Sequence, residues 1–153
     1  MTLARWLLAA AHLLGLGIGL GAIWGRRRAL LELPDPAALR RVLYTDTWWG
    51  IAAAIWISTG LVRAFGPFEK GRDYYLHNHW FQTKMACLLA ILALEVAPML
   101  TFIQWRRQLA RRGNVDTTKA KLFARTSAWQ AILVLIMVLA ATAMARGLGT
   151  LAR

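Results

Sequence analysis

The sequence is poor in cysteine and histidine, and both shortages exclude classes of protein. Its one cysteine, Cys87, has no partner for an internal disulfide, which excludes a small disulfide-bonded scaffold. Cys87 falls inside an apolar run, so we interpret it as a small core residue. The three histidines show no zinc-type spacing, and neither a Ser/His/Asp set nor a phosphate-binding loop is present. Protein classes defined by those motifs are therefore excluded.

Charge is also scarce, whereas apolar residues are abundant. Only 17% of the 153 residues are charged and 58% are hydrophobic, which excludes a disordered chain and is too apolar for an ordinary soluble domain. Four apolar stretches are long enough to cross a bilayer as helices at about 1.5 Å per residue, namely 7–24, 48–65, 80–102 and 128–145. Most of the eight tryptophans lie near their ends, where the amphipathic ring prefers the headgroup level. We therefore predict an all-α integral membrane four-helix bundle, with 1–153 as a single transmembrane domain.

The basic residues predict how the bundle is oriented. Lys and Arg outnumber Asp and Glu by 19 to 7. Two connections hold most of them: Arg26, Arg27, Arg28, Arg40 and Arg41 in one, and Arg106, Arg107, Arg111, Arg112, Lys119, Lys121 and Arg125 in the other. Because two spans separate these connections, they share one side, and the positive-inside rule places that side in the cytoplasm and both termini outside. We therefore expect a multi-pass protein of the bacterial inner membrane, in contact with membrane lipids.

The basic balance has a second interpretation, which we consider weaker. A pI near 11.4 is typical of proteins that bind nucleic acid. No recognition motif accompanies it, and the charges lie where membrane topology requires them. No nucleic-acid partner is therefore expected.

Local signals refine the two basic connections. Asp35 followed by Pro36 is typical of a helix start and predicts a short segment, 37–44, on the cytoplasmic surface. Gly113 predicts a helix end, and Asp116 predicts the cap of the next helix. The third and fourth helices are therefore expected to form a long antiparallel hairpin that extends into the cytoplasm.

Ionisable side chains inside a membrane are costly, so those within the predicted spans are candidate functional residues. His12 lies about 9 Å below Trp6 on an ideal helix, and Lys84 lies about 6 Å below Trp80, both at helix ends that face the outside. Arg63 approaches the same leaflet from the end of the second span. The loop that follows contributes Tyr75, His77 and His79. We therefore predict that these residues form one cluster in the outer leaflet.

Two interpretations of this cluster stay open. In the first, His12 is a metal ligand, because a neutral imidazole in an apolar helix is a natural axial ligand for haem iron, and nearby Arg, Lys and Tyr side chains hold the propionates. The residues that would hold the cofactor, haem b, are His12, Arg63, Tyr75, His77 and His79. In the second, His12 hydrogen-bonds to a neighbouring helix, while Arg63 and Lys84 extend outwards to the headgroups.

The first span contains a regular pattern of glycines. Gly15, Gly17, Gly19 and Gly21 form two interleaved small-xxx-small patterns, which allow a partner helix or a flat ligand to come close. Helix packing alone is the simpler interpretation.

Glu95 is an acidic residue within the third span. It lies about 16 Å from Lys84 on an ideal helix, too far for an ion pair. We expect Glu95 to bond to Gln130 or Ser127 instead and therefore to be uncharged.

Several short segments resemble a known family. They are 74–78 (Tyr-Tyr-Leu-His-Asn), Lys84-Met85, Leu94-Glu95, Pro98-Met99, Trp105-Arg106 and 140–147 (Ala-Ala-Thr-Ala-Met-Ala-Arg-Gly). On these segments the chain resembles, over nearly its whole length, a bacterial family of small predicted inner-membrane proteins classed as a domain of unknown function. That resemblance implies a four-helix membrane fold and no particular activity.

A more distant similarity is to the HemJ-type, haem-containing protoporphyrinogen oxidases. His12 early in the first helix, and Trp80 followed closely by Lys84 at the start of a later one, match that family's pattern. The similarity implies a haem ligand at His12 and a porphyrin-facing or charge-pairing role in catalysis for Lys84. The chain departs from the family at 25–28 (Gly-Arg-Arg-Arg), where a Leu-Pro-Arg type of ending is usual, and at 94–95 (Leu-Glu), where a Tyr-His pair is usual.

We therefore expect a haem- or porphyrin-binding redox protein with an outer-leaflet site around His12 and Lys84. If the protein is an enzyme, the similarity implies an oxidoreductase related to protoporphyrinogen oxidase. The alternative is a non-enzymatic membrane subunit or assembly factor of a larger complex, in which the glycine pattern and the basic hairpin make protein contacts. Because four spans enclose little interior, a homo-oligomer or a membrane-protein partner is expected under either interpretation.

Overall fold

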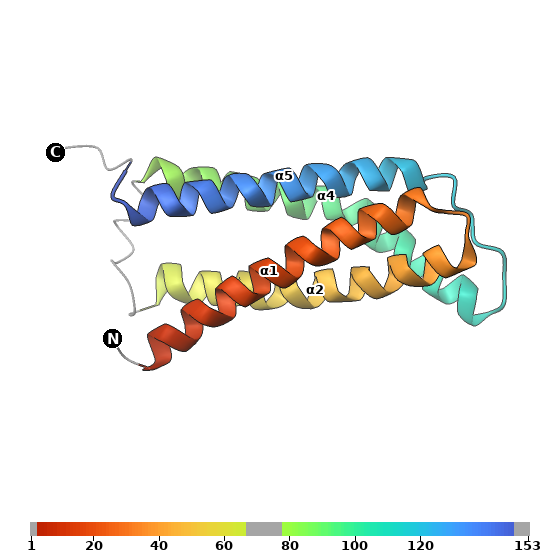
Figure 1. Cartoon of the computed structure of the whole chain (residues 1–153), viewed down its shortest axis with the longest axis horizontal. Helices are drawn as coiled ribbons and strands as arrows, with labels where there is room; N and C mark the ends of the chain where they lie inside the picture. The colour runs from red at the N-terminus through yellow and green to blue at the C-terminus, as the bar shows by residue number, and fades with distance from the viewer. Residues whose placement is uncertain (1–2, 67–77, 149–153) are drawn as a thin grey trace.

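The computed structural model describes residues 3–66 and 78–148, which form an all-helical bundle (Figure 1). Its helices are α1 (Leu3–Leu31), α2 (Pro36–Phe65), α4 (His79–Ala110) and α5 (Ala120–Ala145). All four are long and apolar enough to cross a membrane. They run alongside one another, so that α1 begins and α5 ends at the same end of an elongated bundle (Figure 1). The predicted all-α, four-span architecture is confirmed, whereas its orientation in the membrane stays a prediction.

Helix α1 is central to the packing, because it contacts both α2 and α5, while α5 also contacts α4. Its contact with α2 depends on glycine. A Cβ atom at Gly15 would lie 3.3 Å from the backbone nitrogen of Trp56, and one at Gly19 would lie 3.5 Å from the Trp49 ring. One of the two glycine patterns therefore packs helices within the chain. The other pattern, Gly17 and Gly21, faces open space within the described part of the chain.

The buried side chains form two clusters. One surrounds Phe102 and Phe123 near the end where α1 meets α2, and the other contains Trp49, Trp56 and Cys87 further along the bundle. Cys87 is thus the small core residue that its apolar surroundings predict. The outer surface is apolar as well, with exposed leucines and isoleucines on every helix. This arrangement is typical of a bundle that faces lipid rather than water.

The first basic connection is more helical than predicted. The first span was expected to end at residue 24, but α1 continues to Leu31, so Arg26 is a helical residue with 0% exposure rather than a loop residue. The predicted surface segment 37–44 is the beginning of α2, which runs without a break to Phe65. The helix start itself is confirmed, because the Asp35 carboxylate accepts a hydrogen bond of 3.0 Å from the backbone N–H of Ala37. The expected break is absent because residues 44–48 include no glycine or proline, and the weak helix propensity of Thr45, Asp46 and Thr47 is not enough to interrupt a packed helix.

The connection between α4 and α5 contains the predicted helix end. α4 stops at Ala110, and the backbone N–H of Gly113 donates to the carbonyl of Gln108 at 2.9 Å. Asp116 does not cap α5 as predicted. Its carboxylate accepts from the backbone N–H of Thr118 at 2.9 Å and so caps a turn, because α5 begins two residues after Thr118. The same hydrogen bond lowers the pKa of Asp116 below its ordinary value.

The α4–α5 hairpin is longer than a bilayer core. α4 has 32 residues and is therefore about 48 Å long, against a hydrocarbon thickness of about 30 Å. That the hairpin extends beyond the membrane into the cytoplasm stays a prediction.

Candidate functional site

Two groups of polar side chains lie inside the bundle, one at each end. The first group is a cavity that contains His12, which we call the His12 cavity. The second is a set of hydrogen-bonded charges centred on Arg26, which we call the Arg26 network. The two residues are four helical turns apart on α1, about 21 Å.

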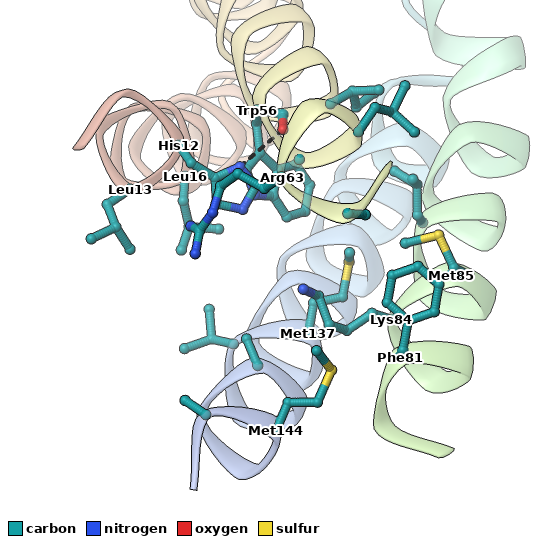
Figure 2. Close-up of a pocket in the computed structure, with 18 of the residues that line it drawn as sticks. His12, Leu13, Leu16, Trp56, Arg63, Phe81, Lys84, Met85, Met137 and Met144 are labelled. Carbon is teal, nitrogen blue, oxygen red and sulfur yellow. Dashed lines mark hydrogen bonds between the residues drawn. The ribbon is translucent and has the colours of Figure 1, made fainter. Parts of the chain in front are cut away.

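All four helices line the His12 cavity, which has a volume of about 330 Å³ (Figure 2). Most of its lining is apolar, with leucines and aromatic rings on α1, α2 and α4. Three thioethers also line it, those of Met85, Met137 and Met144. The basic side chains that line it are Arg63 from α2 and Lys84 from α4. The cavity therefore combines an apolar interior with cationic groups, which suits a molecule that is mostly apolar and carries negative charge.

The surroundings of His12 determine which ring nitrogen carries the proton. Nδ1 lies 3.1 Å from the carbonyl oxygen of Trp56 and 3.0 Å from the hydroxyl oxygen of Thr59. A carbonyl can only accept, and the Thr59 hydroxyl already donates to the carbonyl of Ile55 at 2.6 Å. Nδ1 must therefore carry the proton, which leaves Nε2 with a lone pair. Histidines that bind metals are commonly held in this way, with the other ring nitrogen donating to a backbone carbonyl.

Space for the imidazole comes from a glycine. A Cβ atom at Gly60 would lie only 3.1 Å from Cε1 of His12. The Trp56 ring packs nearby, with its centroid 6.0 Å from that of the imidazole. Trp56, Thr59 and Gly60 are spaced i, i+3 and i+4 on α2, so they form one seat for His12. The i, i+3, i+4 spacing of these three residues is visible in the sequence, but nothing in the sequence indicates that His12 of α1 packs against them.

The structure brings three of the predicted site residues, His12, Arg63 and Lys84, into one cavity. In Figure 2, Arg63 lies beside His12, and the Lys84 amine extends from α4 into the space between the helices. His79 is exposed and is not among the cavity's lining residues. Tyr75 and His77 lie outside the described residues. The hydrogen bond from His12 to a neighbouring helix, which the second interpretation expects, is present, whereas the roles of these residues in cofactor binding and catalysis stay predictions.

The Arg26 network joins all four helices through one buried guanidinium. The Arg26 guanidinium forms a bidentate ion pair with Glu95 of α4, donating to its two carboxylate oxygens at 2.7 and 2.9 Å. It also donates to the Asp46 carboxylate of α2 at 3.0 Å. Its remaining N–H groups donate to Ser127 at 3.2 Å and Gln130 at 2.8 Å, both on α5. All five donors of the guanidinium are therefore satisfied. This complete pairing explains how a charged side chain is accommodated with no exposed surface.

The charges of the network balance. Asp46 is also paired with Arg106 of α4 at 2.8 Å, so two carboxylates face two guanidinium groups. The Arg26 guanidinium also lies 5.6 Å from the centroid of the Phe102 ring. The network is therefore neutral as a whole, the condition under which buried charges are tolerated.

The network corrects one prediction and confirms part of another. Gln130 donates to Glu95 at 2.6 Å, as expected, whereas Ser127 bonds to Arg26 rather than to Glu95. The expectation that Glu95 has only amide or hydroxyl partners was wrong, because it omitted Arg26, which α1 carries into the bundle by continuing past residue 24. One pattern in the sequence predicts this placement. His12, Gly15, Gly19, Ala22 and Arg26 recur at alternating intervals of three and four residues, which puts them on one helix face.

Comparison with known proteins agrees with the helical membrane architecture. Residues 4–149 match a family model described as "Predicted membrane protein (DUF2214)". No curated protein and no solved structure gives a significant match. Because the family model covers nearly the whole chain, the protein belongs to this family of predicted membrane proteins.

Proposed function

We propose that the protein binds a haem or a related porphyrin in the His12 cavity and uses it for a redox task. The observation that carries the proposal is the hydrogen bond from Nδ1 of His12 to the Trp56 carbonyl. It leaves the Nε2 lone pair for a metal ion, in a cavity whose walls are otherwise apolar.

The residues that line the His12 cavity fit a haem or a related porphyrin. Apolar walls suit a flat macrocycle, while Arg63 and Lys84 suit its carboxylates. A volume of about 330 Å³ is at the lower end for ligand sites, so part of a macrocycle would extend out of the cavity towards lipid. Haem b is the form expected, because the chain has no Cys-x-x-Cys-His motif for covalent attachment.

Each side chain has a distinct role in this proposal. A bound haem supplies one-electron chemistry. His12 would hold the metal through Nε2, and Thr59 would keep the imidazole in the required tautomer. Lys84 would bind a carboxylate, or hold a proton at Nζ for transfer to a substrate, from its place on the cavity wall. Arg63 would bind the second carboxylate.

Visible absorbance of the detergent-purified protein, oxidised and then reduced with dithionite, tests the proposal. We expect a Soret band that sharpens on reduction in the wild type. His79→Ala removes an exposed imidazole outside the cavity lining, so it should retain the haem and change at most the positions of its absorbance bands. His12→Ala should lose the cofactor while retaining its helical circular dichroism. Full haem content in a folded His12→Ala variant would overturn the proposal, as would a flat spectrum of wild type expressed with ample haem.

We further propose that the membrane is the bacterial inner membrane, with the α1–α2 and α4–α5 connections in the cytoplasm and the two termini outside. The support is the number of exposed basic residues at the end of the bundle that carries both connections. Cysteines introduced one at a time at Gly113 and Leu148, in a Cys87→Ala background, test the orientation with a membrane-impermeant maleimide in intact spheroplasts. Leu148→Cys should react before lysis and Gly113→Cys only after it. The reverse pattern would contradict the proposed orientation.

A non-enzymatic subunit is the second candidate, and the open glycine pair favours it. A Cβ atom added at Gly17 or Gly21 would meet no described side chain and no other described helix within 4 Å. That face of α1 therefore has room for a helix of another chain, either a second copy or a membrane-protein partner. A mild-detergent pull-down yielding a colourless protein with a partner of fixed stoichiometry would favour this candidate. A coloured protein without a partner would count against it.

A further inference from the structure

We propose that the protein binds anionic phospholipid headgroups through a belt of basic side chains around one end of the bundle. The members of this basic belt are Arg28 on α1, Arg40 on α2, and Lys121 and Arg125 on α5. The proposal does not depend on what occupies the His12 cavity. It depends on where the Arg26 network places each helix along the bundle.

The Arg26 network fixes a common level on three helices. Arg26 is hydrogen-bonded to Asp46 and to Ser127, so these residues of α1, α2 and α5 lie at nearly the same height. Since one residue advances an α-helix by about 1.5 Å, neighbouring residues can be placed relative to that level. α1 runs in one direction along the bundle, whereas α2 and α5 run in the opposite direction (Figure 1).

An exposed tryptophan lies two residues from this level on each of the three helices. Trp24, Trp48 and Trp129 are 54%, 40% and 59% exposed. All three lie about 3 Å from the network on the same side, the side of the long apolar surfaces. Tryptophan prefers the boundary between hydrocarbon and headgroups, so three independent helices mark one boundary.

The basic belt lies on the opposite side of the network. Arg28 and Arg125 are two residues beyond it, about 3 Å, while Arg40 and Lys121 are six residues beyond it, about 9 Å. The headgroup layer on each side of a bilayer is about 5–8 Å thick. Arg28 and Arg125 therefore lie about 6 Å from the tryptophan level, within the headgroup layer. Arg40 and Lys121 lie about 12 Å from that level, just outside the layer, and their long side chains can extend back to the lipid phosphates. The four cations lie around the perimeter of the bundle rather than only at its tip.

The belt charges are not neutralised within the described part of the chain. All four side chains are exposed, and none of them forms an ion pair with a described acidic residue. Arg41, directly beside the belt, differs because it pairs with Glu32 and Asp35. The belt thus presents positive charge where a phosphodiester of a lipid would be, and an exposed lipid-facing perimeter fits lipids better than a nucleic acid or a partner protein.

Lipid binding to the full-length protein in a neutral detergent tests the proposal. Native mass spectrometry would count bound phosphatidylglycerol, with phosphatidylcholine as the zwitterionic comparison. The variant Arg28→Gln/Arg40→Gln/Arg125→Gln removes three belt charges, and Arg107→Gln/Arg111→Gln/Arg112→Gln removes three exposed charges around the α4–α5 turn. Each basic residue near an anionic surface contributes about fivefold in affinity, so we expect phosphatidylglycerol binding to weaken at least about tenfold in the belt variant.

The control arms separate the remaining explanations. We expect the turn variant to keep most of its phosphatidylglycerol binding, and inorganic phosphate or a DNA duplex to compete weakly. Helical circular dichroism of both variants checks folding. Equal losses in the two folded variants would overturn the belt and indicate net charge alone. Complete displacement of the lipid by DNA, with phosphatidylcholine bound as well as phosphatidylglycerol, would also overturn it.

Discussion

Replacing Glu95 by glutamine should destabilise the bundle far more than a typical loss of an ion pair. Glu95 binds Arg26 through both carboxylate oxygens, and Arg26 has no exposed surface. Glutamine keeps the shape but removes the charge, and its amide N–H₂ group faces an N–H₂ group of the guanidinium. Arg26 is then left with Asp46, which already pairs with Arg106. The network therefore retains one uncompensated buried positive charge.

The magnitude follows from the burial. Removing one partner of a buried ion pair costs about 3–5 kcal/mol, and we expect the lower end, about 3 kcal/mol, because Asp46 offsets part of the charge. Glu32→Gln is the matched control, since its pair with Arg41 is about half exposed and should contribute no more than about 1 kcal/mol. The double variant Arg26→Met/Glu95→Leu removes both charges. It should be more stable than Glu95→Gln alone, because no buried charge is left without a partner.

Reversible unfolding in mixed micelles of increasing SDS fraction, followed by circular dichroism, gives the free energy of unfolding of each variant. Similar values for Glu95→Gln and Glu32→Gln would refute the reasoning, since they would mean that Arg26 is not held by Glu95 in the folded protein. A double variant less stable than the single one would refute the charge argument specifically. It would show instead that the contacts with α5 depend on the guanidinium.

Three further predictions concern glycine and pH. Gly15→Ala should destabilise by about 1–3 kcal/mol in the same SDS assay, because its methyl group would press on the α2 backbone, whereas Gly17→Ala faces open space in the described structure and should be neutral or stabilising. If haem binds as proposed, Gly60→Ala should displace His12 and shift the Soret band or lower haem content, and an unchanged spectrum would count against the seat on α2. The lowered pKa of Asp116 means that its cap is present above the ordinary carboxyl pKa and is lost as the pH falls through the folded-state pKa. Protection of the Thr118 amide, measured as its exchange rate relative to the intrinsic rate at each pH, should therefore decrease in acid in the wild type. In Asp116→Asn, which has no carboxyl to protonate, this protection should not change over the same pH range.

Hydropathy and tryptophan positions were sufficient to predict the four-helix architecture. Each apolar span is long, and the tryptophans near its ends are a second signal that does not depend on hydropathy. The error at Arg26 has a physical origin. The positive-inside rule treats an arginine next to a span as a loop charge, but whether that arginine faces lipid or the interior depends on its helix face. Arg26 shares its face with Gly15 and Gly19, which pack against α2.

The candidate site was predicted in part for a similar reason. The depth of His12 and Lys84 below flanking tryptophans was enough to place both in one leaflet, and the structure puts them in one cavity. The seat formed by Thr59 and Gly60 could not be predicted, because it depends on how α1 and α2 are aligned along their axes. That alignment results from packing between helices and not from any single span.

The distribution of charge in the Arg26 network has a consequence for how the chain is inserted as it is synthesised. The first pair of helices carries Arg26 and Asp46, one charge of each sign, and these two side chains bind each other. The second pair carries Glu95 and Arg106, again one of each sign, while the α5 members of the network are uncharged. Each helical hairpin therefore brings its own countercharge, and neither has to enter the bilayer with a net charge from the network. When the two hairpins meet, Glu95 would pair with Arg26 and Arg106 with Asp46, and these two ion pairs would join the hairpins into one bundle.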